Sequence, residues 1–435
     1  MLFSIGMLST RDLKPDLLLG LTVMAETISS MASKPEKGER RADGIRRSPG
    51  FALRASAARG CGAMAEQENN MVDVKVFAEA LEDSAREQIE EISACPAFEG
   101  SKIRIMPDAH RGKGCVIGFT ANLGDKVIPN LVGVDIGCGM YCVPLAETIA
   151  RDDLVQFNRD VKRAVPTGFQ LHRDAACDLA DFDMDSRGWL ENKRKVERSM
   201  GTLGGGNHFI ELDEDEGGRQ YLVVHTGSRN MGKQTAEHHQ ALAHATCAAD
   251  VPDELKYLEG DLSAEYLVDM HNCQRFSNEN RKAIIAQIVE RTGIKLDGDG
   301  FTTMHNYISE DGMIRKGAIS AHEGETVLIP FNMRDGAVIA RGKGNEDWNC
   351  SAPHGAGRAM SRAKAFQTLD AAAFVSEMRE AGIYCPSACD ATLDESPEAY
   401  KDAGEVLRLM GATVEIVHRL KPIWNFKATG KRGRR

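Results

Sequence analysis

The sequence contains no apolar run long enough to cross a membrane and no C-x-x-C pair of cysteines. A membrane helix needs about 20 consecutive apolar residues, and the apolar runs of this chain are shorter and interrupted. Its eleven cysteines are an odd number and are spread along the chain, which does not fit a disulfide framework. We therefore expect reduced thiols, a cytoplasmic location and no membrane partner.

The chain also lacks an excess of positive charge. Its 435 residues carry a net charge of −10, with 54 lysines and arginines against 64 aspartates and glutamates. This balance argues against a broadly basic coat for nucleic acid. It leaves room for a local basic groove, because binding responds to the field at the site. A hydrophobic content of 42% is typical of a globular protein with an ample core.

The N-terminal residues differ in composition from the remainder. An interrupted apolar stretch is followed by KPEKGERRADGIRRSPGFALRASAARGCG, which is rich in Arg, Gly, Ala and Ser and has no periodicity. We expect residues 1–71 to be a disordered extension. Alternatively, they are the product of an upstream start codon that is not the native one. The folded domain is then predicted to span residues 72–435.

Within that domain, short β-rich runs are mixed with glycine turns and a few amphipathic helices. The sequence predicts strands at residues 102–107, 114–121, 130–136, 221–227 and 325–331. It predicts helices at residues 150–165, 233–246, 263–292 and 398–420. Because there is no regular β–α alternation and no internal repeat, the pattern favours one large α+β domain over a doubly wound sheet.

Five segments place metal-ligating residue types beside glycines at the ends of apolar runs: residues 106–118, 132–140, 201–212, 223–232 and 304–307. A buried carboxylate or thiol in such a turn is costly unless a cation lies nearby. The segments supply enough ligands for a metal pair with a bridging thiolate, namely Asp135, Cys138, His208, His225 and His305. The competing interpretation, a hydrogen-bonded core histidine at each position, is not excluded by spacing alone.

This mixed ligand set suits Mn²⁺, Zn²⁺, Co²⁺ or Fe²⁺ better than Mg²⁺ or Ca²⁺, which prefer oxygen ligands. The run GTLGGGNHF also resembles a phosphate cradle, but it lacks the Lys-Ser/Thr of a P-loop. Other residues of these types are expected to have no chemical role. We predict a solvated helix face for His238, His239 and His244, and structural roles for Cys385 and Cys389.

One further histidine, His354, stands directly before Gly-Ala-Gly-Arg in the stretch NCSAPHGAGRAMSR. It could be an incidental residue in a tight turn into a helix. Alternatively, it could be a histidine that meets a bulky anion at close range, with small neighbours on one side. These residues by themselves leave both interpretations open.

Seven ordered segments resemble the RtcB family of RNA-splicing ligases: PDAHRGKG, VGVDIGCGM, GGGNHFIEL, HTGSRNMG, HNY, RKGA and HGAGRAMSR. The resemblance runs from about residue 75 to residue 427. It implies the family's own α+β fold and a ligase that depends on GTP and on two Mn²⁺ ions. The implied substrates are an RNA 3′-phosphate or 2′,3′-cyclic phosphate end and a 5′-hydroxyl end, in RNA repair or tRNA splicing. An activator protein is a candidate partner.

The resemblance also implies roles for individual residues. His354 would accept GMP from GTP and pass it to the RNA 3′-phosphate, and its small neighbours would leave room for the phosphates. Cys138 would bridge the two Mn²⁺ ions. Asp135 and His208 would complete one metal site. His225 and His305 would complete the other.

Further residues are implied to contact phosphate or nucleotide. Asn207 and Arg229 would assist catalysis by holding the guanylate phosphate or the RNA end. The full set implied to bind the guanine nucleotide is Asn207, Glu211, Asn306, His354, Gly355, Gly357, Tyr400 and Lys427.

The chain departs from the common family pattern in a loop and at its C-terminus, as expected of a divergent bacterial branch. Phe331, Asn332 and Arg334 stand where many members have small residues, which bears on nucleotide preference. A basic tail, TGKRGRR, follows Ala428. Three alternatives to a ligase stay open: an enzyme that caps 3′-phosphate ends with GMP, a two-metal phosphoesterase, and an RNA-binding subunit without catalysis.

Overall fold

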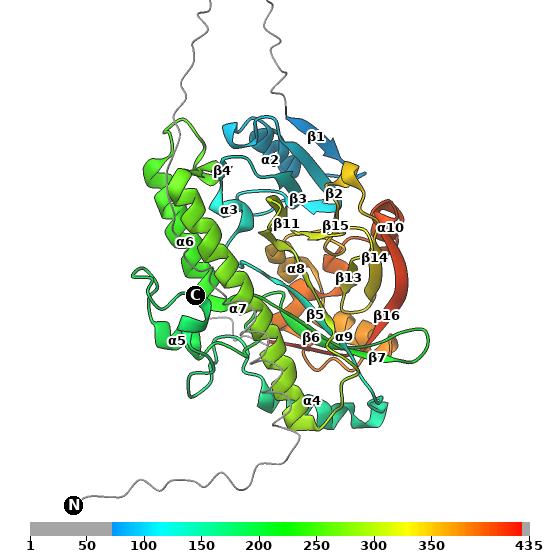
Figure 1. The fold of residues 1–435 in the computed structure, drawn as a ribbon. Helices are drawn as coiled ribbons and strands as arrows, with labels where there is room; N and C mark the ends of the chain where they lie inside the picture. The colour runs from blue at the N-terminus through cyan, green and yellow to red at the C-terminus, as the bar shows by residue number, and fades with distance from the viewer. Residues whose placement is uncertain (1–71, 429–435) are drawn as a thin grey trace, which may run out of the picture. The chain divides into compact units, whose positions relative to one another are not determined.

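The computed structural model describes residues 72–428 of the chain (Figure 1). The predicted extension, residues 1–71, and most of the basic tail, residues 429–435, lie outside the described residues. The described chain has a mixed α+β fold, which confirms the predicted fold class. None of its helices within residues 72–428 is long and apolar enough to cross a membrane.

Two large sheets contain most of the strands of the described chain. The five-stranded sheet has the order β1 (Asp73–Val76), β2 (Lys102–His110), β3 (Ile117–Asn122), β11 (Met313–Lys316) and β10 (Asn306–Ile308). The seven-stranded sheet has the order β13 (Thr326–Asn332), β14 (Gly336–Gly342), β16 (Val414–Lys427), β6 (Phe209–Glu214), β7 (Gln220–Thr226), β5 (Gly139–Pro144) and β9 (Phe301–Met304). Two short pairs join β12 (Ala318–Ser320) to β15 (Ser351–Pro353) and β4 (Lys126–Val127) to β8 (Leu258–Glu259).

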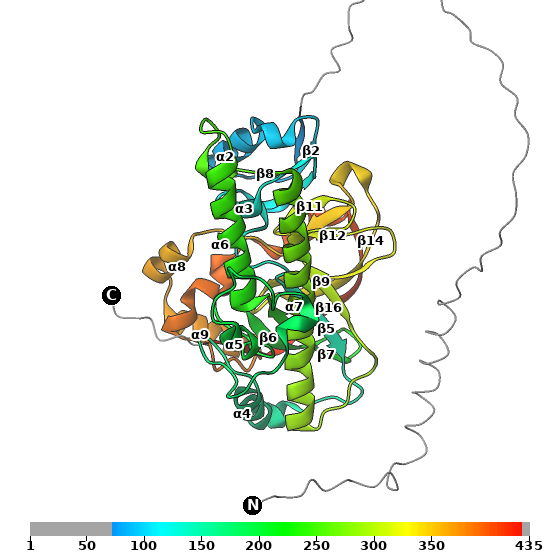
Figure 2. The same cartoon turned by 60° about the vertical axis from the view of Figure 1, so that its left-hand side comes forward.

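The α-helices are α2 (Asp83–Ser93), α3 (Pro129–Val132), α4 (Leu154–Ala164), α5 (Lys193–Glu197), α6 (Arg229–Thr246), α7 (Gly260–Thr292), α8 (Arg362–Thr368), α9 (Ala371–Glu380) and α10 (Ala403–Met410). Short 3-10 helices are η1 (Pro96–Phe98), η2 (Arg151–Asp153), η3 (Leu179–Phe182), η4 (Asp253–Leu255), η5 (Glu346–Trp348), η6 (Asp390–Glu395) and η7 (Pro397–Ala399). The long helix α7 lies beside α6 along part of its length and contacts α4 near its other end (Figures 1 and 2).

The central part of the seven-stranded sheet packs a core cluster on one face and carries a mixture of apolar and polar side chains on the other. Successive side chains of a strand point to opposite faces. On β6, Ile210 and Leu212 join a core cluster with side chains of α4 and α7, so Glu211 between them points to the other side of the sheet. On β7, Val224 belongs to the same core and His225 follows it. The face opposite this core therefore carries two of the candidate site residues, Glu211 and His225.

Most of the predicted elements are confirmed. Strands β2, β3, β7 and β13 overlap predicted strands, and helices α4, α6 and α7 overlap predicted helices. The prediction of a strand at residues 130–136 is wrong. Pro129 starts the short helix α3 there, and Gly133, with a φ of 80°, ends it before a turn.

Two further predictions need correction. The predicted helix at residues 398–420 contains α10, but its last residues begin the long strand β16, where β-branched side chains pair with β14. The three histidines of α6 do not share a solvated face. His244 is exposed, whereas His239 is fully buried with its Nε2 atom 2.9 Å from Oδ2 of Asp269.

Candidate active site

The five predicted metal ligands, which are far apart in sequence, converge in one place. The Sγ atom of Cys138 lies 3.2 Å from Nε2 of His225 and 3.6 Å from Nε2 of His208. Nε2 of His225 lies 3.2 Å from Nε2 of His305. Nε2 of His208 lies 2.9 Å from Oδ2 of Asp135. These residues form two groups that share Cys138, and the ligand atoms of each group lie within 4.8 Å of one another.

Turns at the ends of strands bring these side chains together. Asp135 and Cys138 lie in the turn between α3 and β5, whereas His225 lies on β7 and His305 directly follows β9. The backbone at Gly227 approaches this turn closely, which explains why position 227 is a glycine. A Cβ atom on Gly227 would lie 2.1 Å from Oδ1 of Asp135, so a side chain at position 227 would displace the carboxylate.

Backbone carbonyls orient two of the imidazole rings. Nδ1 of His208 lies 3.0 Å from the carbonyl oxygen of Leu203, and Nδ1 of His225 lies 3.1 Å from that of Asn207. When Nδ1 carries the proton and donates it to the carbonyl, the lone pair of Nε2 points into the cluster. This arrangement is the one that metal-binding histidines adopt.

The electrostatics of the cluster fit a bound cation. Burial lowers the pKa of His225 and His305 well below the ordinary value, so both imidazoles are neutral and offer lone pairs. Burial and the neighbouring Asp135 raise the pKa of the Cys138 thiol. Burial opposes ionisation of Asp135, but His208 holds its pKa at about 2. A thiol, neutral imidazoles and a carboxylate converging in this way are the ligands of a borderline transition ion.

His354 adjoins the cluster through a ring contact. Its imidazole stacks on that of His305, with the ring centroids 4.9 Å apart. Nδ1 of His354 lies 2.6 Å from Oδ2 of Asp108, which has no exposed surface. The side chain of His354 is one-fifth exposed. Because Nδ1 is engaged with Asp108, Nε2 is the nitrogen available to act as a nucleophile.

The small residues after His354 permit close backbone packing. A Cβ atom on Gly357 would lie 2.1 Å from the backbone oxygen of Asp108, and Gly357 has a φ of 70°. A Cβ atom on Gly355 would lie 2.7 Å from the backbone oxygen of Pro330. The glycines thus allow the His354 segment to approach the strand that carries Asp108, in addition to leaving space around the imidazole.

Comparisons with known proteins agree with this geometry. The profile of a family described as tRNA-splicing ligase RtcB matches residues 88–196 and 180–428. The chain is 30% identical to RNA-splicing ligase RtcB of Escherichia coli strain K12, over 79% of this chain and 94% of the relative. It is 28% identical to tRNA-splicing ligase RtcB of Nanoarchaeum equitans, over 80% of this chain and 92% of the relative. The chain belongs to the RtcB family of RNA-splicing ligases.

In this RtcB-family protein, a cavity of about 990 Å³ adjoins both His354 and the histidine cluster. Its volume is at the upper end of the range usual for small-molecule sites. The cavity is lined by His225, His305 and His354 and by six residues predicted to bind the nucleotide: Asn207, Glu211, Gly355, Gly357, Tyr400 and Lys427. The structure therefore places these six residues around one cavity, which also reaches the candidate nucleophile His354.

A buried carboxylate organises one wall of the cavity. Oε2 of Glu395 lies 3.0 Å from Nζ of Lys427 and accepts a hydrogen bond of 2.7 Å from the hydroxyl of Tyr400. Burial opposes ionisation of Glu395, but Lys427 and Arg362 hold its pKa at about 2. Glu395 thus fixes two of the predicted nucleotide residues by charge and by hydrogen bonding.

Two carboxyl groups, those of Glu211 and Asp213, lie on the face of β6 that is turned away from Ile210 and Leu212. Glu211 accepts a hydrogen bond from the side-chain amide of Asn425, and burial raises the pKa of Glu211 to about 7. Asp213, two residues along the strand, is fully buried, and both of its oxygens lack a hydrogen-bond partner among the described residues. Burial and Glu211 raise the pKa of Asp213 well above the ordinary value. Burial therefore favours a protonated, neutral Asp213 beside Glu211.

Of the residues that line the cavity in the described chain, none is Asp135, Cys138 or His208 of the metal cluster, and three further sequence-predicted residues are also missing. The guanidinium of Arg229 lies over Gly204, where a Cβ atom would be 1.9 Å from it, and its Nε donates to Thr202. Oδ1 of Asn306 accepts a hydrogen bond from the backbone N–H of Gly317. Arg334 pairs with Asp335 and Glu377. The other two loop residues, Phe331 and Asn332, do line the cavity.

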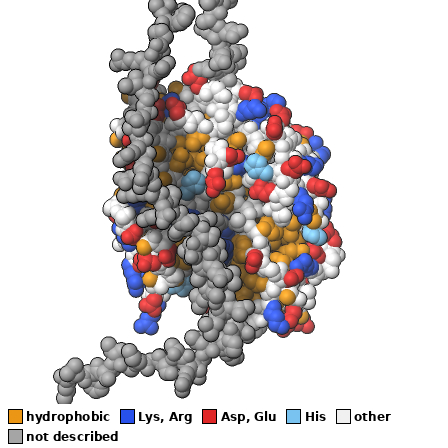
Figure 3. Space-filling model, viewed as in Figure 1, with side chains coloured by type: hydrophobic (Ala, Val, Ile, Leu, Met, Phe, Trp, Pro, Cys, Tyr) orange, Lys and Arg blue, Asp and Glu red, His pale blue; other side chains and the backbone are white. Residues whose placement is uncertain are grey.

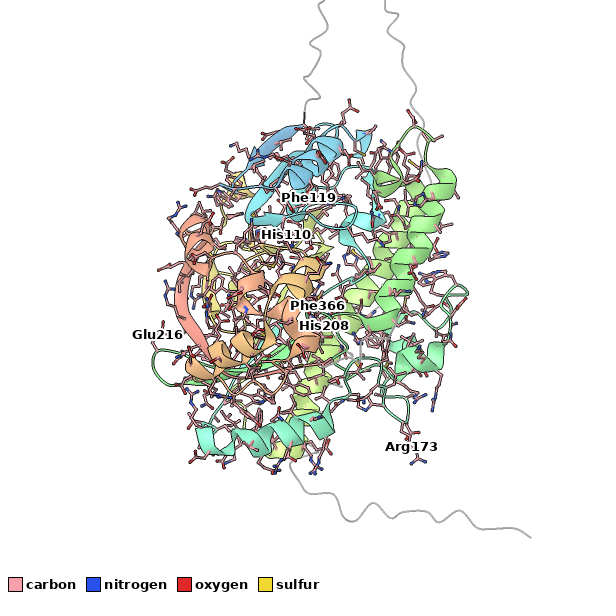
Figure 4. The ribbon with its side chains drawn as sticks, turned by 180° about the vertical axis from the view of Figure 1, so that it is seen from behind. His110, Phe119, Arg173, His208, Glu216 and Phe366 are labelled. Atoms are coloured by element: carbon pink, nitrogen blue, oxygen red, sulfur yellow. The ribbon has the colours of Figure 1, made fainter. Side chains whose placement is uncertain are left out.

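Sequence reasoning assigned no role to Asp108, His110 or Glu395. Asp108 and His110 lie in the motif PDAHRGKG, so their position in a glycine-framed segment was an available signal. His110 lies at the end of β2 and lines the cavity, and burial lowers its pKa to about 4 (Figure 4). Glu395 lies in η6, in a segment without periodicity, and nothing in the sequence pattern singles it out.

Proposed function

We propose that this protein joins an RNA 3′-phosphate or 2′,3′-cyclic phosphate end to a 5′-hydroxyl end, with GTP as the source of activation. The observation that supports this proposal most directly is the His354–Asp108 contact beside the nucleotide-sized cavity. A histidine whose second nitrogen is held by a carboxylate is suited to nucleophilic attack.

In the first proposed step, Nε2 of His354 attacks the α-phosphorus of GTP. A nitrogen–phosphorus bond forms, the bond to the bridging oxygen breaks, and pyrophosphate leaves. Asp108 accepts the hydrogen bond from Nδ1–H and stabilises the positive charge that develops on the imidazole. His354 thereby carries GMP.

Two transfers then complete the reaction. An oxygen of the RNA 3′-phosphate attacks the phosphorus on His354, the nitrogen–phosphorus bond breaks, and the RNA end carries GMP. The 5′-hydroxyl of the second strand then attacks the 3′-phosphate, and GMP leaves with the bridging oxygen. A 2′,3′-cyclic phosphate must first be opened by water, which forms a bond to phosphorus as the bond to O2′ breaks. This step gives the 3′-phosphate monoester that attacks the phosphorus on His354 and leaves a free 2′-hydroxyl.

The residues of the cluster are the proposed ligands of two Mn²⁺ ions. Cys138 would belong to both sites, as its place in both groups supports, with Asp135 and His208 on one side and His225 and His305 on the other. The ions would neutralise phosphate charge and orient the attacking and leaving oxygens. Asn207, whose backbone oxygen orients His225, is proposed to contact the phosphates with its side chain, and Arg229 to hold an RNA phosphate.

At the far wall of the cavity, Glu211, Tyr400 and Lys427 are the proposed contacts of the guanine base. An ionised Glu211 can accept from the N–H groups of guanine, and Lys427 can donate to its carbonyl oxygen. Because the whole sequence has a net charge of −10, binding of the RNA strands must depend on cationic residues at the site. On the face seen in Figure 3, basic and acidic side chains are interspersed. Cationic residues at the cavity, such as Arg111, Lys113 and Lys401, provide that local charge.

Incubation with Mn²⁺ and GTP that carries the label in its α-phosphate, followed by addition of RNA, tests the proposal. A covalent adduct is expected on the wild-type chain and not on His354→Ala, and the label should leave as GMP when both RNA ends are present. A GMP-capping enzyme would accumulate capped 3′ ends without joined strands. A two-metal phosphoesterase would release phosphate from the RNA without any nucleotide. Either result would contradict the ligase assignment.

A further inference from the structure

One aromatic side chain of the described chain is fully exposed. Phe169 has a relative exposure of 104%, whereas the other exposed large hydrophobic residues within residues 72–428 are valines at 43–52%. Single exposed apolar residues are common on proteins. Phe169 is unusual because it is aromatic, touches nothing that shields it, and stands in a loop tied to the active site.

Backbone hydrogen bonds hold this loop firmly. Residues 167–170 form a tight turn in which the N–H of Gln170 donates to the carbonyl of Thr167, and Gly168 takes a φ of 62°. The N–H of Gly168 donates to the carbonyl of Gly204 at 2.7 Å. The N–H of Leu203 donates to the carbonyl of Pro166 at 3.0 Å. The backbone of Phe169 is therefore held in place beside the glycine loop, residues 203–206.

The glycine loop that anchors Phe169 is part of the histidine cluster. The carbonyl of Leu203 orients His208, and Gly204 lies beneath the guanidinium of Arg229. By contrast, residues 166–170 do not line the cavity proposed for the nucleotide. Phe169 thus stands in a turn bonded to the loop whose carbonyl orients His208, and it lies outside the cavity proposed for the nucleotide. A substrate that extends beyond the reacting phosphate would pass this position.

The chain around Phe169 is of mixed charge, and Arg173 is the cationic residue nearest to Phe169 in sequence. Residues 172–176 run beside residues 197–198, since the N–H of His172 donates to the carbonyl of Arg198 and the N–H of Ala176 to that of Glu197. Two arginines, Arg173 and Arg198, therefore lie in this region together with two carboxylates. The two segments are joined, since Nε of Arg198 donates to the carbonyl of His172 at 2.6 Å. Arg173 points outward at the edge of the fold (Figure 4). An exposed aromatic ring with an arginine close to it can stack on a base of a single strand while the guanidinium contacts a phosphate of that strand.

We propose that Phe169 is a stacking platform for a nucleobase of an RNA strand close to the end that is joined. Arg173 would contact the phosphate backbone of the same strand. The inference rests on the proposed RNA-ligase function and extends it to a place where the polymer, beyond its terminal phosphate, is held. A single aromatic residue without a surrounding apolar patch is too small to hold a folded protein. It is sufficient for one base, because every base has a π-face.

Substitutions at Phe169 test the inference without threatening the fold, because the side chain supports no core. Binding of a single-stranded RNA with a 3′-phosphate is measured by fluorescence anisotropy in the absence of GTP. Phe169→Ala and Phe169→Leu are expected to weaken binding by about tenfold, the scale of one base–aromatic stack, whereas Phe169→Trp retains it. Val417→Ala, another exposed apolar position on β16, is the matched control and should bind RNA as the wild type does.

Adduct formation with GTP separates this inference from the proposed function. All Phe169 variants should form the adduct at the wild-type rate, because Phe169 lies outside the cavity. If the wild type forms no adduct, the proposed function fails, while the RNA-binding result still decides the stacking inference. Equal RNA binding by Phe169→Ala and the wild type would overturn the inference, as would a loss in Phe169→Trp that matches the loss in Phe169→Ala.

The stacked base can be located with 2-aminopurine, whose fluorescence is quenched by stacking. The probe is placed at successive positions of the 3′-phosphate strand in one series and of the 5′-hydroxyl strand in another. We expect quenching at one position of one strand with the wild type and its loss with Phe169→Ala. Quenching that is identical in the wild type and Phe169→Ala at every position would contradict a stacking role for this ring.

Discussion

Nδ1 of His354 lies 2.6 Å from Oδ2 of Asp108, and the other oxygen of this buried carboxylate has no hydrogen-bond partner among residues 72–428. The histidine is therefore the main partner of the Asp108 side chain. A carboxylate in this position fixes the tautomer of the imidazole, because Nδ1 must carry the proton that is donated. Asp108 positions the nucleophile in the proposed reaction without contacting the reacting phosphorus.

Asp108→Asn should slow formation of the GMP–His354 adduct by about 10²- to 10⁴-fold, because the amide can donate to Nδ1 and favour the wrong tautomer. The rate is measured at saturating GTP by the appearance of labelled protein. Joining of RNA whose 3′-phosphate already carries GMP should stay close to the wild-type rate, since that step needs no nucleophile from the enzyme.

Asp269→Asn provides a matched control for Asp108→Asn. Asp269 also forms a buried pair with a histidine, but its partner, His239, lies in α6 away from the cavity. This variant should lower the melting temperature and leave the rate of adduct formation nearly unchanged. Equal slowing in the two variants would mean that Asp108 acts through stability alone.

The affinity for GTP should fall as the pH drops below about 7. Burial raises the pKa of Glu211 to about 7, so the group takes up a proton just below neutral pH and loses the charge with which it would accept from guanine. Above that pH the carboxylate is ionised and the affinity should level off. Titration calorimetry of GTP on both sides of this pKa measures the effect.

Glu211→Gln should bind GTP more weakly above the pKa of Glu211 and should lose the pH dependence. Glu216→Gln, an exposed glutamate in the turn between β6 and β7, should keep both the affinity and the pH dependence of the wild type (Figure 4). A pH dependence that persists unchanged in Glu211→Gln would assign the titration to another group.

Mn²⁺ binding should release protons and should strengthen as the pH rises. Burial and Asp135 raise the pKa of the Cys138 thiol, so the thiol is protonated without metal and must lose its proton to become a ligand. Calorimetry in buffers of different ionisation enthalpy measures the protons released. Cys142, a second buried cysteine, lies on the strand β5 that follows Cys138. The Cys142→Ala variant should release as many protons as the wild type, and Cys138→Ala fewer.

The chemical residues were more predictable from sequence than the elements that hold them. Four of the five predicted metal ligands, Asp135, Cys138, His208 and His225, stand within two residues of a glycine, whereas His305 in MHNY does not. The structure brings all five together. At Gly139 and Gly227, near Cys138 and His225, other atoms approach too closely for a Cβ atom.

The supporting contacts could not be derived in the same way. Glu395 meets Lys427 and Tyr400 only through tertiary packing, so no local period in its segment announces it. The start of β16 was predicted as helix because its apolar residues also fit a helical spacing. The pairing with β14 decides its conformation, and that partner lies more than seventy residues earlier in the chain.

The nucleophile and the metal cluster can be separated by giving the enzyme RNA that is already activated. His354→Ala should form no adduct and should not join ordinary 3′-phosphate ends. It should still join RNA whose 3′-phosphate carries GMP, because the attack of a 5′-hydroxyl on that end requires charge neutralisation but no enzyme nucleophile. Cys138→Ala should lose both activities, since Cys138 belongs to both ligand groups. Joined product is measured on denaturing gels with labelled RNA, with Cys142→Ala as the control that retains both activities. If Cys138→Ala joins pre-activated RNA at the wild-type rate, the shared-metal assignment is wrong; if His354→Ala still forms the adduct, the nucleophile lies elsewhere.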